Sequence, residues 1–334
     1  MDFETLNQEE LIEAYKILSE RCLSKAASWI LEFLIAINFN SPIQFDNTPS
    51  NFLFAQSQFK IREYKKVVSV LEECTDQRSI GLRFLARLND TQQEIEQSMV
   101  DSSSFLELFP SSNLSTYESY KPLIEEISPL ADTLDPINLY IYSLILVRGG
   151  RHKDALPFLL KSLNSFPLNR SAWQLLVSLL IRFDDSVIAP SFGSLPKHWT
   201  SQIFRIELFA ELQQTEAALR LIQTINLPRT PSIIALEATV RYHHRDFERS
   251  QQLFEELRKV DPYRIETLEL YSNLLFVKED VAGLSQLSQT LNNIDKFRPE
   301  TLTVSGNFFS INGRHEEAIS HFAMALRFDN TFGF

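Results

Sequence analysis

The chain has 334 residues, a formal net charge of −11 and only eight glycines. Residues 1–135 hold 22 acidic and 11 basic side chains, whereas residues 136–334 hold 21 of each. Because an acidic chain repels nucleic acid and anionic membranes, we expect neither as a partner. The sequence contains no G-x-G-x-x-G and no G-x-x-x-x-G-K-[ST] motif, so nothing indicates a nucleotide-phosphate loop.

The cysteine content and the N-terminus point to a soluble protein of a reducing compartment. Cys22 and Cys74 are the only cysteines, too few for a disulfide framework. The N-terminal MDFETLNQEE is acidic and unlike a signal peptide. The most apolar run, from about Trp29 to Phe39, contains Glu32 and is too short to cross a bilayer.

Residues 1–100 are expected to form degenerate helical hairpins. The first shows helical periodicity, with Leu11, Ala14, Tyr15 and Leu18 on one face. Prolines and polar residues between the apolar segments mark the turns. The expected helices are 7–19, 22–38, 50–60, 62–73 and 79–100.

Residues 101–135 are expected to contain a serine-rich insert followed by a linking helix at about 117–128. A regular helical array is then expected over 136–330. It begins at Pro136, because the first turn of a helix tolerates the missing N–H of proline.

One repeat of this array, at 170–203, is expected to be irregular, because residues 183–199 carry two prolines and a glycine in place of a second helix. Residues 331–334 follow a complete repeat without the polar capping helix that usually closes such an array. We therefore expect the natural chain to continue beyond this truncated end.

The array repeats with a period of about 34 residues. Gly306 and Ala318 are expected where the two helices of one repeat cross, because only small side chains let the backbones approach. Phe309 and Phe322 are expected to fill the wider parts of the same seam. The position of Ala318 is taken in earlier repeats by Ala217 or Ala218, Ser250 and Leu284. The pattern is that of the tetratricopeptide repeat (TPR), and it predicts an all-α superhelix of antiparallel helix pairs.

Three stretches carry a more specific resemblance, in positions that the repeat pattern does not dictate. They are DPYRIETLELYSNLLFVKE at 261–279, IDKFRPETLTVSGNFFSINGRHEEAISHFAMALRF at 294–328, and LPKHW at 195–199. Together they resemble subunit 8 of the anaphase-promoting complex (the cyclosome), the cell-division-cycle protein 23 family. The resemblance is close over 136–330 and looser over 1–135.

That resemblance implies a non-catalytic scaffold of the nucleus and cytoplasm. A member of the family homodimerises through its N-terminal repeats and stacks on other TPR and scaffold subunits of a ubiquitin ligase that acts in mitosis. The sequence departs from the family in lacking the C-terminal repeats. The alternative is a general TPR adaptor that binds peptide tails of partner proteins in its concave groove.

A homodimer requires an apolar surface, and the N-terminal region offers one set of candidates. All of them could equally belong to the internal core. The candidates are Leu11, Tyr15, Trp29, Phe33 and Phe39.

Asn273 and Asn307 are the candidate protein-binding residues. They stand one repeat period apart, each directly after the small position of a first helix. First helices line the concave surface, so the two amides could form a polar ladder for the backbone of a partner; local capping is the alternative. Chaperone-binding TPR domains carry lysines one helical turn earlier, but Glu269 and Thr303 stand there. A clamp for an acidic tail is therefore disfavoured.

No constellation for catalysis, metal or cofactor binding is recognised. The spacing of the six histidines does not fit helical ligand pairs, and they are interpreted as turn or surface residues. Four Ser/Thr-Pro dipeptides are either turn initiators or sites of proline-directed phosphorylation. They are Ser41-Pro42, Thr48-Pro49, Ser128-Pro129 and Thr230-Pro231.

Overall fold

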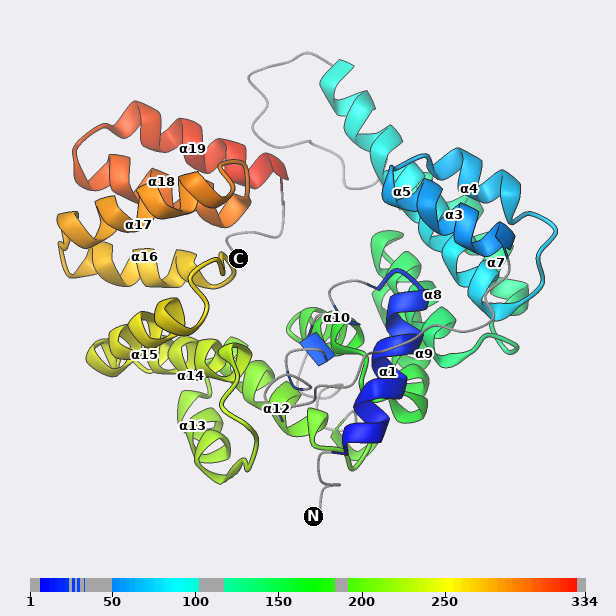
Figure 1. Cartoon of the computed structure of the whole chain (residues 1–334), viewed down its shortest axis with the longest axis horizontal. Helices are drawn as coiled ribbons and strands as arrows, with labels where there is room; N and C mark the ends of the chain where they lie inside the picture. Colours follow the sequence, from blue (N-terminus) through cyan, green and yellow to red (C-terminus); the bar gives the residue numbers. More distant parts are fainter. Residues whose placement is uncertain are drawn as a thin grey trace. The chain divides into compact units, whose positions relative to one another are not determined.

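The computed structural model describes residues 7–23, 26, 27, 29, 30, 33, 50–101, 117–183 and 192–328. The chain divides into unit 1, Met1–Leu208, and unit 2, Phe209–Phe334. All regular secondary structure in the described residues is helical (Figure 1), which confirms the all-α prediction. The expected domain borders at residues 100 and 135 fall inside unit 1 and stay predictions.

Among its described residues, unit 1 is built from helices of 7 to 25 residues and one 3-10 turn. The helices are α1 (Gln8–Glu20), α3 (Ser50–Lys60), α4 (Tyr64–Val70), α5 (Gln77–Asp101), α7 (Lys121–Ile127), the 3-10 turn η1 (Ser128–Leu130), α8 (Pro136–Arg148), α9 (His152–Ser165), α10 (Arg170–Leu180) and α12 (Thr200–Glu211), within which the boundary falls. The predicted helix at 50–60 is confirmed as α3, whereas α4 is shorter than the predicted 62–73. Most of the predicted helix at 22–38 lies outside the described residues.

The α8–α9 pair begins as its sequence predicts. Pro136 occupies the first turn of α8, and the side chain of Asp135 accepts a hydrogen bond from the Asn138 N–H at 2.8 Å. The Ser162 hydroxyl of α9 donates to the Pro136 carbonyl at 2.5 Å. Gly150 turns the chain with φ of +74°, a conformation that a side chain would strain. The hydrogen bond from Ser162 to Pro136 and the glycine turn together hold the two helices close.

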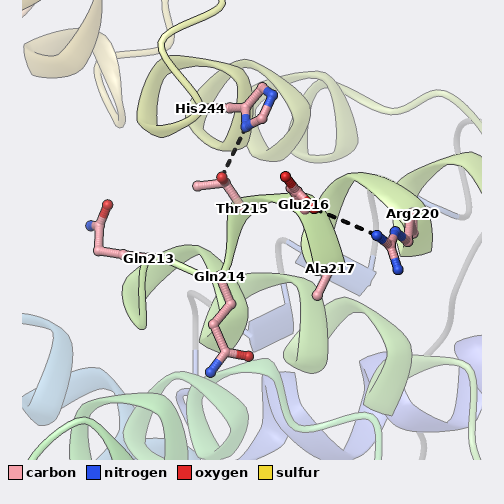
Figure 2. A pocket seen from close by; sticks show the side chains of 7 residues that line it. All are labelled: Gln213, Gln214, Thr215, Glu216, Ala217, Arg220 and His244. Carbon is pink, nitrogen blue, oxygen red and sulfur yellow. Dashed lines mark hydrogen bonds and ion pairs between the residues drawn. The ribbon is translucent and has the colours of Figure 1, made fainter.

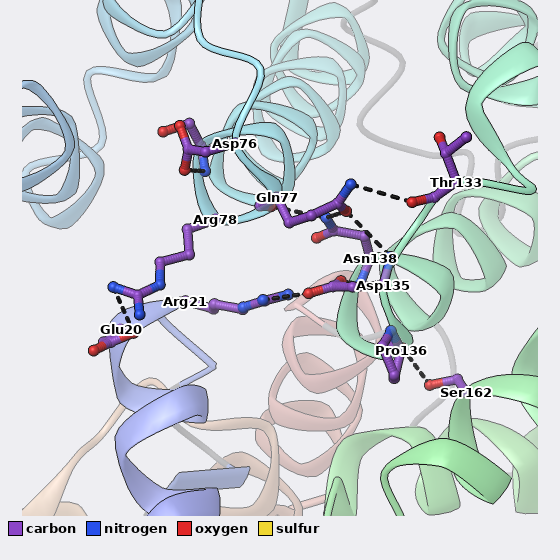
Figure 3. A network of polar contacts seen from close by, with 11 residues as sticks. Glu20, Arg21, Asp76, Gln77, Arg78, Thr133, Asp135, Pro136, Asn138 and Ser162 are labelled. Atoms are coloured by element: carbon purple, nitrogen blue, oxygen red, sulfur yellow. Dashed lines mark hydrogen bonds and ion pairs between the residues drawn. The ribbon is translucent and has the colours of Figure 1, made fainter. Parts of the chain in front are cut away.

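A polar network joins three parts of unit 1 that are distant in sequence (Figure 3). At the end of α1, Arg21 pairs with Asp135, and Glu20 accepts from Arg78 at 3.0 Å. At the start of α5, the Gln77 backbone carbonyl and side-chain oxygen accept from Asn138 Nδ2 at 2.8 and 2.9 Å. The starts of α5 and α8 are thereby fixed against the end of α1.

Unit 2 consists of α13 followed by three antiparallel helix pairs. The helices are α13 (Thr215–Thr224), α14 (Pro231–His243), α15 (Phe247–Val260), α16 (Leu268–Val277), α17 (Val281–Ile294), α18 (Pro299–Ile311) and α19 (His315–Phe328). The pairs are α14–α15, α16–α17 and α18–α19, and the first helix α16 contacts both α14 and α18. Between successive pairs, Phe254 of α15 stacks on Tyr271 of α16 with ring centroids 5.2 Å apart.

The seam between paired helices confirms the packing predicted from small residues. A Cβ atom on Gly306 would lie 2.5 Å from the ring of Phe322, so glycine is needed for α18 and α19 to approach. In the α14–α15 pair, the Ser250 hydroxyl donates to the Ala238 carbonyl at 2.9 Å. Of the two alanines left open at this position, Ala218 is the fully buried one.

Candidate partner-binding surfaces

The two predicted asparagines meet on adjacent first helices. Asn307 Nδ2 of α18 donates to Asn273 Oδ1 of α16 at 2.7 Å and to Ser272 Oγ at 2.8 Å. Their separation by one period places them at the same position of successive repeats, which is why the side chains can touch. The predicted ladder geometry is present, and its use in protein binding stays a prediction.

The row continues to α14 through Tyr242, a residue that sequence reasoning missed. A side-chain hydrogen bond joins the Tyr242 hydroxyl to Asn273, and burial raises the pKa of Tyr242. Tyr242 does not share the periodic position of the asparagines. Thr239 stands at the periodic position, and Tyr242 lies one helical turn after it. A search one turn along the helix would therefore have found Tyr242. The polar row of Tyr242, Asn273 and Asn307 therefore crosses three successive repeats.

Glu269 lies one turn before Asn273 on the same face of α16. Its Oε2 atom is buried and has no hydrogen-bond partner among the described residues, although part of the residue remains accessible. Burial, followed by the charges of Glu300 and Glu266, raises the pKa of Glu269 to about 7. Amides and an acidic group suit a ligand that donates hydrogen bonds, such as a peptide backbone or an ammonium or guanidinium group.

Most of the N-terminal residues predicted for a dimer interface are buried inside their own chain. Leu11 is 1% exposed, Phe33 is 0% and Trp29 is 8%, whereas Tyr15 is half-buried. Phe39 lies outside the described residues. Little of Leu11, Trp29 or Phe33 is left for a second copy to contact in this conformation. The dimer interface itself stays a prediction.

The N-terminal aromatic side chains pack against Trp199, which lies just before α12. Trp29 stacks on Trp199 with centroids 5.6 Å apart, and Phe33 lies 5.1 Å from the same ring. The guanidinium of Arg170 lies over Trp29 at 5.6 Å and also pairs with Glu207. Trp199 is consequently only 3% exposed.

Of the six histidines interpreted as turn or surface residues, His198 lies in the turn before α12 but is buried. It is 2% exposed, its Nδ1 lies 2.7 Å from the Thr200 hydroxyl, and its Nε2 lies 3.4 Å from a carboxylate oxygen of Glu10. Burial lowers the pKa of His198 to about 4, so it is uncharged at neutral pH. The N-terminal helix covers this loop, which could not be foreseen from the loop alone.

An open pocket in unit 2 is polar (Figure 2). The Thr215 hydroxyl lies 2.9 Å from His244 Nδ1, and Arg220 pairs with Glu216 at 3.5 Å. All four side chains are largely accessible to water or paired with each other, so the pocket is a surface hollow rather than an enclosed reaction site. It is lined by Gln213, Gln214, Thr215, Glu216, Ala217, Arg220 and His244.

The described residues contain no group of three or more histidines, cysteines, aspartates or glutamates arranged to hold a metal ion. Over the same part of the chain, no helix is both long and apolar enough to cross a membrane.

Comparison with known proteins places the chain in a family. A model of the family described as anaphase promoting complex subunit 8 / Cdc23 matches residues 44–226, more than half of the chain. The chain belongs to this family. The matched stretch starts well before residue 136, so the relationship extends further toward the N-terminus than the motifs at 195–328 indicate.

Curated relatives from plants, animals and fungi support membership in the anaphase-promoting complex subunit 8 / Cdc23 family. Arabidopsis thaliana anaphase-promoting complex subunit 8 is 28% identical over 97% of this chain. The mouse cell division cycle protein 23 homolog is 31% identical over 70%, and the Saccharomyces cerevisiae subunit CDC23 is 27% identical over 75%. The chain spans 63% of the plant relative, 39% of the mouse relative and 41% of the yeast relative.

Proposed function

We propose that this chain is a non-catalytic scaffold subunit of the anaphase-promoting complex, acting in cell-cycle-dependent ubiquitination. The observation that carries the proposal is the family match over residues 44–226, together with relatives named as subunits of that complex. Stacked helix pairs suit a scaffold, because they hold partners at fixed separations without contributing chemistry. The other subunits of the complex are its expected partners, and the nucleus and cytoplasm its expected location.

Purification of the tagged chain from dividing cells tests this proposal. Mass spectrometry should find further subunits of the complex in near-stoichiometric amounts, and fluorescence imaging should place the chain in nucleus and cytoplasm. Recovery of the chain with none of those subunits would contradict the scaffold role. Ubiquitin transfer by the isolated chain, supplied with activating and conjugating enzymes, would contradict the non-catalytic part.

We further propose that the scaffold is a homodimer formed through its N-terminal region. Among the described members of the predicted set, Tyr15 on α1 has the most surface left for a second copy. Sedimentation equilibrium at micromolar concentration should give twice the chain mass, and Tyr15→Asp should shift it toward the monomer. Tyr263→Asp, on an exposed residue of unit 2, serves as the matched control. A monomeric parent chain at that concentration would refute the dimer.

The polar row supports a second candidate function, that of an adaptor for peptide tails. Asn307 bridges to Asn273, which in turn reaches Tyr242, so the amides present one continuous row to a bound backbone. A phage-displayed random peptide library is the probe. Asn273→Ala or Asn307→Ala should abolish enrichment, whereas Asn312→Ala, in the exposed turn after α18, should not. Equal enrichment on all variants would remove this candidate.

A further inference from the structure

Exposed aromatic side chains recur along one edge of unit 2. Tyr263, between α15 and α16, is 77% exposed, and Phe297, between α17 and α18, is 62% exposed. The two residues are 34 positions apart, so they hold the same place in successive repeats. The antiparallel pairing of the helices puts both inter-repeat loops at the same end of the pairs (Figure 1). Tyr263 and Phe297 are therefore neighbouring steps of one edge.

The last residues of the second helices extend this row. Val260 ends α15, Ile294 ends α17 and Phe328 ends α19, again at intervals of 34 residues. Val260 is 56% exposed and Phe328 is 61% exposed, whereas Ile294 is half-buried. One exposed apolar residue is ordinary on a protein surface, but a row of five at equivalent positions indicates a surface that binds a partner. The five residues form the apolar ridge: Val260, Tyr263, Ile294, Phe297 and Phe328.

The loop that carries Phe297 holds its shape without the aromatic ring. Asp295 Oδ1 accepts from the Phe297 N–H at 3.1 Å, and Arg298 pairs with Glu300 at 2.8 Å. The ring itself lies open, with the Lys296 ammonium 5.8 Å from its centroid. Because the loop is already fixed by polar contacts, a partner that covers the ring has little conformational freedom to remove. The ridge is thus prepared for binding before a partner arrives.

Charge does not select the partner of the ridge. Residues 259–266, around Tyr263, hold two basic and two acidic side chains, and residues 293–300, around Phe297, do the same. A nucleic acid or an anionic membrane would require an excess of basic residues along this edge. The ridge therefore suits the apolar face of a protein partner.

The spacing of the two aromatic residues matches an α-helix. The first helices α16 and α18, which begin shortly after Tyr263 and Phe297, are in contact, and packed helices lie about 8 to 10 Å apart. Residues at i and i+7 of an α-helix share a face and are separated by about 10.5 Å along its axis. We propose that the apolar ridge is the docking site for an amphipathic α-helix of a partner protein, with apolar residues at i and i+7 over Tyr263 and Phe297. This inference goes beyond the scaffold role and does not depend on it.

A designed peptide helix probes the ridge on the full chain. It carries leucines at i, i+3 and i+7 among alanine, glutamate and lysine, and a control peptide of the same composition has the last leucine on the opposite face. Fluorescence anisotropy of the labelled peptides should show about tenfold tighter binding of the first, and Tyr263→Ser/Phe297→Ser should weaken that binding about tenfold. Val277→Ser, on a residue that is 61% exposed at the other end of α16, should leave it unchanged.

Two further measurements define the contact. Raising the salt from about 0.1 M to about 1 M should change the affinity for the helical peptide less than about twofold, because the contact is apolar; loss of binding would refute an apolar contact. Asn273→Ala should also leave this affinity unchanged, since Asn273 belongs to the polar row and not to the ridge. Failure of the ridge and failure of the adaptor for peptide tails are thereby distinguishable.

The proposal is overturned by equal binding of the two peptides, or by binding that the double variant leaves unchanged. Tighter binding of a proline-rich peptide would also overturn it, because residues three apart in a polyproline helix have a similar spacing and would then be the ligand. A shift of the sedimenting mass toward the monomer with Tyr263→Asp would make a second copy of the chain the occupant, and so refute the partner helix.

Discussion

The α18–α19 repeat and the irregular repeat around Trp199 bury their large side chains in different ways. In α18–α19, Phe322 packs on Gly306 of the paired helix, within the same repeat. In the irregular repeat, Trp199 is covered by Trp29 and Phe33, from the opposite end of the unit 1 sequence. One contact is local and recurs with the period; the other is unique and long-range.

Local packing can be read from a repeat sequence, whereas long-range packing cannot. A periodic seam is specified by residues within one helix pair, so its packing follows from the spacing of small and aromatic residues. Trp199, just before α12, obtains its cover from elsewhere in the chain. The N-terminal segment supplies that cover through Trp29, Phe33 and the contact between Glu10 and His198.

The largest effect is expected where the long-range cover is removed. Trp199→Ala would leave Trp29 and Phe33 facing a cavity, and should lower the free energy of unfolding by about 3 to 5 kcal/mol. Urea unfolding followed by circular dichroism measures the change. Phe297→Ala, on an aromatic that is 62% exposed, is the control and should stay within about 0.5 kcal/mol. Equal losses in both variants would show that the stack contributes no special stability.

A smaller loss is expected at the periodic seam. Gly306→Ala places a methyl group 2.5 Å from the Phe322 ring, and the adjustment should cost about 1 to 3 kcal/mol. The double variant Gly306→Ala/Phe322→Leu should recover part of that loss, since the ring is the obstacle. Gly193→Ala, which meets no atom within 4 Å, should be nearly neutral. If the double variant lost more stability than the two single variants together, the Phe322 ring would not be the obstacle to the added methyl group.

The pH dependence of stability should distinguish Glu269 from ordinary surface carboxylates. The folded-state pKa of Glu269 is about 7 against an ordinary value of 4.5, so between these pH values the folded chain binds more protons than the unfolded chain. The free energy of unfolding should therefore fall as pH rises through that window. Glu269→Gln should remove this part of the fall. From pH 5 to pH 8, the free energy of unfolding of the variant should therefore rise relative to that of the parent chain by on the order of 1 to 3 kcal/mol.

Thermal unfolding across that pH range gives the comparison for Glu269. Glu316→Gln, on an exposed residue of α19, is the control and should follow the parent curve. A Glu269→Gln curve parallel to the parent curve would mean that the carboxyl is already ionised at pH 5 in the folded chain.

The smallest effect concerns the backbone at the start of α16. Thr267 has φ of +70°, a left-handed conformation that is costly for a β-branched residue and easier for asparagine. Thr267→Asn should raise the free energy of unfolding by about 0.5 to 1 kcal/mol, as measured in urea. Thr267→Val keeps the branched side chain and should bring no gain. A loss of stability with Asn would contradict the expected relief.

Much of the fold and part of the candidate site were predictable from the sequence. The helix pairs, the close approach at Gly306 and the meeting of Asn273 with Asn307 all follow from the repeat period. Tyr242 was missed because it stands one turn away from the periodic position, and the buried acid at Glu269 because burial of one oxygen has no signature in the spacing. The burial of His198 was not foreseen because its cover comes from the far N-terminus.

The all-α class and the paired helices follow from the repeat period in the sequence, and the motifs at 195–199, 261–279 and 294–328 carry the resemblance to the subunit 8 family. The folded chain was needed to show which N-terminal residues are buried, and that Trp199 packs on Trp29 and Phe33. The cause is the separation of the contacting residues along the chain. Neighbouring helices constrain each other within one period of the chain, whereas a contact such as that of Trp29 with Trp199 depends on how all the helices between them stack.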